Sequence, residues 1–160
     1  LVERVAFRMR AAAEDQGVNP KALSTTLVAA VVELTPPDRP RNCFVFRLGD
    51  STALLLRNGA FQELWADAHG DGAVSDSGTE ALPGHIRPVD TEMIRLGGDD
   101  ALVICTDGLV NPMRNQDVRA DLARCWSTGP VPGLLEFACQ LGFRAKSFGD
   151  DRTAVCIWGR

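Results

Sequence analysis

The sequence DALVICTDGLV, residues 100–110, places five apolar residues directly before Thr106, Asp107 and Gly108. A short apolar run that ends in a glycine-containing turn predicts a buried strand over Ala101 to Cys105. Asp107 would then lie at the rim of that strand. Gly108 has no side chain, so another part of the backbone can approach it closely. This stretch therefore predicts a core strand that delivers a carboxylate to the edge of a sheet.

Two other acidic segments share this arrangement. Asp50 follows the predicted strand Asn42 to Leu48 and is preceded by a glycine. Asp150 and Asp151 come just before the last predicted strand, Thr153 to Trp158. If these strands are neighbours, three or four carboxylates converge at one end of a sheet. Taken singly, an Asp beside Gly is more often a turn residue, because its side chain hydrogen-bonds the local backbone.

Apolar periodicity and turn residues predict the other elements. Asn58-Gly59 predicts a tight β-hairpin, because both residues tolerate positive φ. The segment 66–88 is rich in Gly, Asp and Ser and predicts a long loop that borders a functional cleft. We expect helices over Leu1–Gln16, Asp117–Cys125 and Val131–Leu141, and strands over Thr25–Leu34, Asn42–Leu48, Thr52–Arg57, Phe61–Trp65, Met93–Leu96, Ala101–Cys105 and Thr153–Trp158.

The order of these elements predicts the fold class. Met93–Leu96 and Ala101–Cys105 are expected to form a strand pair around the turn Gly97–Asp100. Runs of strands followed by runs of helices indicate an α+β fold, with helices packed on two stacked antiparallel β-sheets. The length of 160 residues fits a single domain over residues 1–160.

Composition narrows the class of partner and the compartment. The net charge of −4 argues against nucleic acid or an anionic membrane surface as the main partner. No stretch approaches the roughly 20 apolar residues of a membrane span. Four of the five scattered cysteines lie in apolar segments, as small core residues do, which predicts a reduced, cytoplasmic setting. The five cysteines are Cys43, Cys105, Cys125, Cys139 and Cys156.

The Ala- and Arg-rich composition indicates a bacterial source.

Converging carboxylates point to a particular chemistry. Crowded like charges repel unless a cation neutralises them. Mg²⁺ and Mn²⁺ prefer carboxylate oxygens, and a pair of such ions activates water and stabilises charge on a phosphoryl oxygen. This is the chemistry of phosphomonoester hydrolysis without a covalent enzyme intermediate.

Other residues are weaker candidates for chemistry. Cys105 is predicted to be buried and so a poor nucleophile. His69 and His85 are interpreted as solvated loop histidines, and Trp65 and Trp158 as packing residues. Some arginines can contact phosphate, although surface arginines near turns usually have no specific role. These are Arg39, Arg41, Arg47 and Arg57.

Four motifs in order resemble the protein phosphatase 2C family of metal-dependent serine/threonine phosphatases. The segment Ser24–Ala30 resembles the family's Gly-Thr-Thr strand, and Leu48–Gly59 resembles its Gly-Asp-Ser hairpin. The segment Asp100–Leu109 is similar to its Ser-Asp-Gly motif, and Gly149–Val155 to its closing Asp-Asn-x-Thr strand. The resemblance implies a β-sandwich flanked by helix pairs and phosphoserine or phosphothreonine in proteins as substrates.

The resemblance also implies roles for four residues. Asp107 and Asp150 would be catalytic residues that hold one metal ion, and Asp50 would serve a further, weaker metal site. Asp151 would orient or join the metal shell. Two or more Mn²⁺ or Mg²⁺ ions are the implied cofactors, and phosphorylated proteins the implied partners.

Departures from the family pattern keep an alternative open. The family's bridging Asp-Gly segment lies upstream of its first matching helix, so the domain is expected to be incomplete at its N-terminus. Asp71-Gly72 does not match that segment by position. Asn111 and Thr52 replace an Asp and an Arg that many relatives carry. These departures favour a pseudophosphatase with weak or no activity that acts as a binding or regulatory module.

Overall fold

The computed structural model describes residues 1–36, 39–65, 81–145 and 149–160. In this part of the chain all the predicted helices and strands are present, with bounds that differ by a few residues. The short helices η1, α2 and η3 are additional. The elements in chain order are α1 (Val2–Asp15), η1 (Pro20–Leu23), β1 (Leu27–Val32), β2 (Arg41–Leu48), β3 (Thr52–Arg57), β4 (Ala60–Glu63), β5 (Asp90–Leu96), β6 (Ala101–Cys105), α2 (Asp107–Val110), η3 (Pro112–Arg114), α3 (Gln116–Ser127), α4 (Leu134–Leu141) and β7 (Ala154–Trp158).

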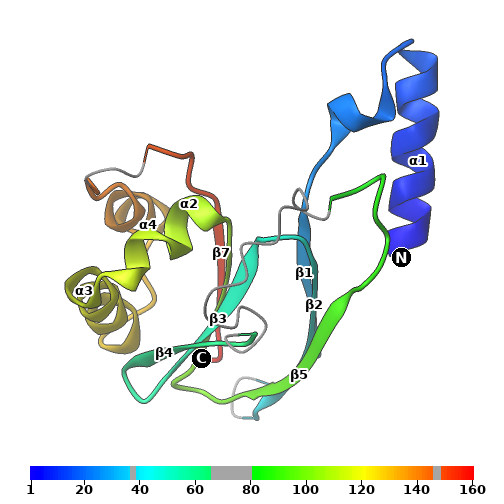
Figure 1. Cartoon of the computed structure of the whole chain (residues 1–160). Coiled ribbons are helices and arrows are strands. Elements are labelled where there is room, and N and C mark those ends of the chain that lie inside the picture. Colours follow the sequence, from blue (N-terminus) through cyan, green and yellow to red (C-terminus); the bar gives the residue numbers. More distant parts are fainter. Residues whose placement is uncertain (37–38, 66–80, 146–148) are drawn as a thin grey trace.

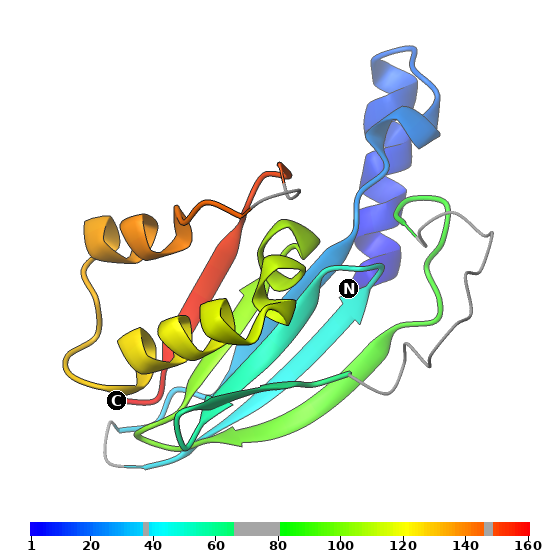
Figure 2. The ribbon, with the colours of Figure 1, turned by 60° about the vertical axis from the view of Figure 1, so that its left-hand side comes forward.

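The strands form two antiparallel sheets. One has the order β1-β2-β5 and the other has the order β4-β3-β6-β7. Helices α2, α3 and α4 lie together on the outer side of the four-stranded sheet, whereas α1 extends from one end of the three-stranded sheet (Figures 1 and 2). The predicted α+β class, with stacked antiparallel sheets and flanking helices, is confirmed.

The central strand β3 shows why the layers stack. Successive side chains of a strand point to opposite faces. Ala53 and Leu55 therefore pack in the cluster between the two sheets, while Leu54 and Leu56 pack beneath the helices. All four are at most 5% exposed. A strand that is apolar on both faces needs a layer on each side, and the second sheet and the helices provide these layers.

Aromatic side chains join the helices to the four-stranded sheet. The ring of Trp126 on α3 lies 5.8 Å from Phe61 and 5.4 Å from Phe137 on α4, between ring centroids. Phe137 in turn contacts Trp158 on β7 at 5.8 Å. Such pairs stabilise beyond the area they bury. Trp158 is therefore a packing residue, as predicted.

The predicted β-hairpin over β3 and β4 is present. Arg57 pairs with Ala60 across the two-residue turn. Asn58 and Gly59 have φ angles of 53° and 74°. Both angles lie in the left-handed region, which Asn and Gly adopt more readily than other residues.

The prediction that Met93–Leu96 and Ala101–Cys105 pair with each other is wrong. Strand β5 pairs with β2 in one sheet, and β6 pairs with β3 and β7 in the other. The turn between them carries the chain from one sheet to the next. Leu96 and Leu102 are both fully buried between the sheets, so burial from two sides, rather than direct pairing, explains their apolar character.

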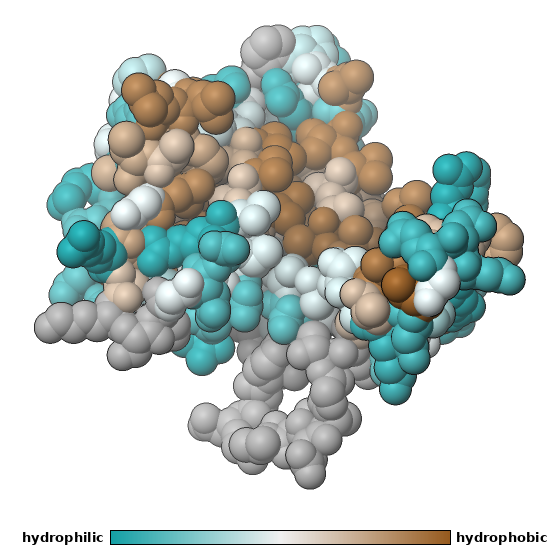
Figure 3. Space-filling view, turned by 90° about the horizontal axis from the view of Figure 1, so that it is seen from above, coloured by the Kyte–Doolittle hydropathy of each residue, from teal (hydrophilic) through white to brown (hydrophobic). Residues whose placement is uncertain are grey.

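Helix α1 covers only the end of its sheet. Ala6 packs with Leu48 and Leu82, but Phe7 on another face is 72% exposed. Viewed from above, apolar surface gathers between α1 and the other helices, and hydrophilic side chains cover much of α1 (Figure 3). No helix in the described residues has the length and apolar content needed to cross a bilayer.

The cysteines only partly follow the prediction that they are core residues. Cys43 and Cys105 are buried and Cys156 is half-buried, but Cys125 on α3 and Cys139 on α4 are exposed. An apolar stretch on a helix also has an outward face, and these two residues lie on it.

An ion pair fastens the turn between the sheets. Arg57 Nη2 lies 2.7 Å from Asp100 Oδ2, and the Gly97 N–H donates to the same oxygen at 2.7 Å. Arg57 Nη2 also donates to the Arg95 carbonyl at 2.6 Å. Burial acts to raise the pKa of Asp100, but the hydrogen bonds from Arg57 and Gly97 outweigh it, so this pKa lies below its ordinary value.

Replacing Asp100 with Asn should lower the free energy of unfolding near pH 7 by about 1–3 kcal/mol, because charge-assisted hydrogen bonds are lost. Since the pKa of Asp100 is lowered by folding, this contribution is present above the unfolded-state pKa of about 3.9 and disappears as the pH falls through the folded-state value. The difference in urea unfolding between wild type and D100N should therefore begin to shrink near about pH 4 and vanish only below the folded-state pKa of Asp100. The exposed neighbour variant D99N is the control, and an equal loss in both would contradict this role.

Candidate functional site

The register of the four-stranded sheet brings the acidic segments to the same end of its strands. Thr52, the first residue of β3, pairs with Cys105, the last residue of β6, and Cys105 pairs with the first residue of β7. Asp50 and Asp107 lie two residues beyond these ends, and Asp150–Asp151 lies just before β7. Because neighbouring strands are antiparallel, all three acidic segments emerge at the same end of the sheet.

Asp107 is held at the start of the short helix α2. Thr106 is the N-cap residue, and the Gly108 N–H donates to Asp107 Oδ1 at 2.8 Å. The side chain is half-buried. Asp107 thus lies at the rim of β6 as predicted, but it starts a helix of four residues, which is too short to leave a periodic pattern in the sequence.

Asp50 lies in the connection between the two sheets. Gly49 has a φ of 98°, a backbone conformation that favours glycine. The Ser51 hydroxyl lies 2.9 Å from the Thr26 hydroxyl, and this hydrogen bond ties the connection to the residue before β1. Asp50 itself is exposed. The tight turn therefore fixes the backbone and leaves the carboxylate in front of β3.

Asp50 and Asp107 share one cavity of about 260 Å³. Its lining combines acidic and basic side chains at the end of the four-stranded sheet. The lining residues are Arg47, Asp50, Thr52, Glu63, Asp107, Val110, Asn111 and Arg114. Of the four predicted metal ligands, these two therefore face a common space.

Asp150 and Asp151 line a separate cavity, of about 900 Å³, between the end of α4 and the segment before β7. Both side chains are exposed. Their backbone nevertheless meets the first site, because a Cβ added to Gly108 would overlap the Asp151 carbonyl oxygen. The fold thus brings the Asp150–Asp151 backbone against Gly108, next to Asp107, but divides the side chains of the four acidic residues between two cavities.

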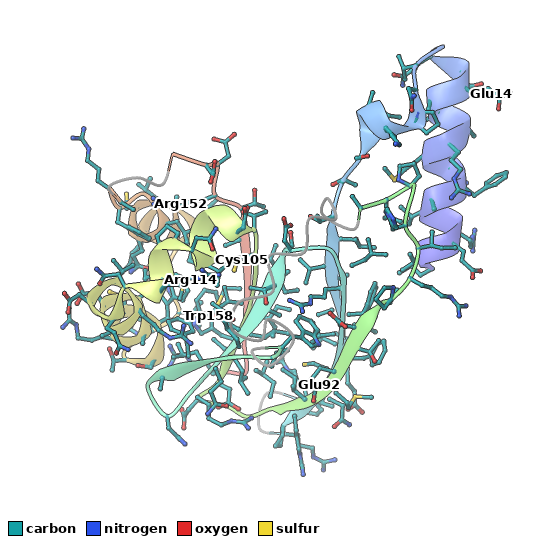
Figure 4. All side chains as sticks on the ribbon, in the orientation of Figure 1. Glu14, Glu92, Cys105, Arg114, Arg152 and Trp158 are labelled. Atoms are coloured by element: carbon teal, nitrogen blue, oxygen red, sulfur yellow. The ribbon has the colours of Figure 1, made fainter. Side chains whose placement is uncertain are left out.

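Arg152 stabilises the contact between Gly108 and the Asp150–Asp151 backbone. Its Nη1 donates to the carbonyls of Leu141 at 2.7 Å and Phe143 at 2.5 Å, and its Nε donates to the Gly108 carbonyl at 3.2 Å. The guanidinium also lies 4.1 Å from the centre of the Phe143 ring. Figure 4 shows Arg152 beside α2 and α4. One side chain thus links the end of α4, the start of α2 and the Asp150–Asp151 segment.

The chemical type of the donors, carboxylate oxygens, suits a divalent metal ion. In the part of the chain that the structure describes, neither Asp50 nor Asp107 is paired with a basic side chain. Mg²⁺ is commonly bound through one or two carboxylates, with waters as its other ligands. The described residues contain no group of three or more His, Cys, Asp or Glu side chains placed to hold a metal. The roles of Asp50, Asp107, Asp150 and Asp151 as ligands remain predictions.

Arg47 is a cavity residue whose burial the sequence does not predict. It is 4% exposed, and so is not a surface arginine. Its guanidinium lies 4.7 Å from the centre of the Trp65 ring, and its Nε donates to Asp90 Oδ2 at 2.8 Å. The only sequence signal for the burial of Arg47 is a charged residue within the apolar alternation of β2. Its partners, Trp65 and Asp90, lie far from it along the chain.

The sequence predicts that Cys105, His69, His85 and Asp71-Gly72 are weak candidates for chemistry. Burial, with a smaller contribution from the charge of Glu63, raises the pKa of Cys105 to about 12, so this thiol is not a nucleophile at neutral pH. His85 is exposed. His69, Asp71-Gly72 and most of the predicted loop, residues 66–80, lie outside the described residues.

Replacing Gly108 with Ala should displace the Asp150–Asp151 backbone, because the new methyl group would overlap the Asp151 carbonyl. We expect a loss of about 1–3 kcal/mol in the free energy of unfolding. Amide chemical-shift changes should be concentrated in residues 106–110 and 149–153. Gly98→Ala is the matched control, since a Cβ at Gly98 meets nothing within 4 Å. Unchanged shifts in G108A would contradict this contact.

Comparisons with known proteins identify the family. A family model described as protein phosphatase 2C matches residues 1–137. A search of curated proteins found no match.

Solved structures share the fold at low sequence identity. PppA, described as a key regulatory component of T6SS in Pseudomonas aeruginosa, is 20% identical with a TM-score of 0.66, covering 97% of this chain and 65% of that one. The catalytic domain of the serine/threonine protein phosphatase PstP, in complex with two manganese ions, is 20% identical with a TM-score of 0.65, covering 94% and 64%. The S. agalactiae serine/threonine phosphatase is 19% identical with a TM-score of 0.60, covering 97% and 66%.

The chain thus spans less than two thirds of each of these solved structures. The match to the family model extends over most of this chain and includes the motifs around Asp50 and Asp107. The two antiparallel sheets with flanking helices agree with the fold of these solved structures. The chain belongs to the protein phosphatase 2C family.

Proposed function

We propose that the protein is a metal-dependent serine/threonine phosphatase that hydrolyses phosphoserine and phosphothreonine in proteins. The observation that carries this proposal is the shared cavity of Asp50 and Asp107, together with the contact between Gly108 and the Asp150–Asp151 backbone. Membership of the family and the phosphatase neighbours support the same reaction class.

We assign each acidic residue the role that the family resemblance implies for it. Asp107 and Asp150 would hold the cation, with the Asp107 carboxylate oriented by the Gly108 N–H. Asp50 contributes from the turn before β3, and Asp151 orients or completes the shell. Divalent cations, if bound there, would supply a nucleophile at neutral pH and stabilise charge on the phosphoryl oxygens. Mn²⁺ and Mg²⁺ both suit carboxylate donors.

Arg152 serves as a positioning residue in this proposal. It fixes the Asp150–Asp151 segment against α2 through three backbone carbonyls. Asp150 is exposed, so its carboxylate can turn toward Asp107 without breaking a buried contact. The fold thus fixes the distance between the two backbone segments, while the side chains stay free to meet around a cation.

A binding module without turnover is the second candidate. Asn111 lines the cavity beside Asp107, and an amide is a neutral and weaker metal ligand than a carboxylate. A protein of this kind would retain a phosphorylated peptide in the cavity and release no phosphate.

Asp107→Asn should reduce phosphate release from a phosphothreonine peptide with Mn²⁺ by at least about 100-fold, because charge stabilisation worth several kcal/mol is lost. The full-length protein is assayed by colorimetric phosphate release. Asp121→Asn, an exposed carboxylate on α3, is the control and should retain activity. Equal activity in D107N and wild type would remove Asp107 from the mechanism. Peptide binding without phosphate release in the wild type would instead favour the binding module.

A further inference from the structure

Arg47 is a buried cation held on two sides. Burying a charge is costly unless it is paired. The face of the Trp65 ring and the carboxylate of Asp90 provide this pairing, at 4.7 Å and 2.8 Å. Asp90 is itself 42% exposed at its side chain, whereas that of Arg47 is 5% exposed. The two contacts therefore fix the guanidinium at one place below the surface.

The terminal nitrogens of Arg47 are available to the cavity that it lines. An arginine has five N–H donors, and within the described residues only the Nε of Arg47 donates to a protein acceptor. Arg114 lines the same cavity. It follows two buried residues of η3, Pro112 and Met113, which anchor its backbone. Among the described residues, no hydrogen bond or ion pair occupies the Arg114 guanidinium. Two cationic side chains thus converge on the space in front of Asp50 and Asp107.

We propose that Arg47 and Arg114 form the binding site for the phosphoryl group of a phosphomonoester in this cavity. This assignment rests on the proposed function and names the residues that recognise the substrate's phosphate. A guanidinium matches two phosphate oxygens with parallel N–H donors. Because Arg47 is already fixed by Trp65 and Asp90, it loses little side-chain freedom when it binds an anion.

The size of the cavity fits a small anion. Its volume of about 260 Å³ is below the range of roughly 300–1,000 Å³ for pockets that enclose drug-sized ligands. The space accommodates a phosphoryl group with its waters and cations.

The acidic side chains of the cavity make this binding depend on cations. The cavity has three carboxylates, Asp50, Glu63 and Asp107, of which Glu63 lies 3.7 Å from Arg119. They repel a phosphate unless their charge is neutralised. An anion should therefore bind more tightly when a divalent cation is present, and the two arginines should contribute in that state.

Titration calorimetry of inorganic phosphate, in Mg²⁺ and separately in EDTA, tests the proposal on the full-length protein. Wild type should bind phosphate more tightly in Mg²⁺. In Mg²⁺, R114Q and R47K should each raise the Kd about 10-fold, since each removes charge-assisted hydrogen bonds. R47K keeps the charge but loses the planar set of donors. R95Q, which removes an exposed charge on β5, is the control and should bind as wild type does.

Three results would overturn the assignment. These are no measurable phosphate binding by wild type, unchanged affinity in both R114Q and folded R47K, or an equal loss in R95Q. Urea unfolding shows whether R47K is folded, and the exposed Arg114 gives an independent reading if it is not. Phosphate release by R114Q and R47K with a wild-type KM would refute this assignment alone. Phosphate binding that needs both arginines, without hydrolysis by wild type, would instead refute the proposed function alone.

Discussion

The antiparallel register of β3, β6 and β7 is the constraint on which the rest of the site depends. Because Thr52 is paired with Cys105, and Cys105 with Ala154, the start of β3, the end of β6 and the start of β7 occupy one edge. A shift by one residue would turn the apolar side chains of these strands to the opposite faces. Such a shift would exchange Ala53 and Leu55, which pack between the sheets, with Leu54 and Leu56, which pack beneath the helices. The packing of the two layers therefore opposes the shift, and the register determines where the acidic segments emerge.

Three arginines stabilise the arrangement that the strand register sets up, and each makes different contacts. Arg57 and Arg152 donate to neighbouring carboxylate and carbonyl oxygens and so hold the chain in place. Arg47 is held equally firmly by Trp65 and Asp90. Within the described residues these contacts leave its terminal nitrogens, Nη1 and Nη2, available to the cavity. A fixed guanidinium beside two carboxylates gives a site with both signs of charge. Such a site suits a phosphate accompanied by cations.

Much of this fold could be predicted from the sequence, because local patterns encode it. The strand Thr52–Arg57 and the Asn58-Gly59 turn follow from apolar runs and from residues that tolerate positive φ. The partner of β5 could not be predicted, because Leu96 and Leu102 are equally apolar whether their strands pair directly or lie in stacked sheets. Nor could the division of the carboxylates between two cavities, since side-chain direction beyond a strand end has no periodic signal. Arg47 escaped prediction because its burial depends on Trp65 and Asp90, which the fold brings from distant segments.

The central claim is that the carboxylates at this sheet edge meet around a divalent cation. Anomalous diffraction from crystals of the full-length protein grown with Mn²⁺ tests it most directly. The account predicts an anomalous peak bound by the Asp107 carboxylate, with Asp150 or Asp50 as a second ligand. Asp107 and Asp150 facing apart, with no manganese between α2 and the segment before β7, would contradict it.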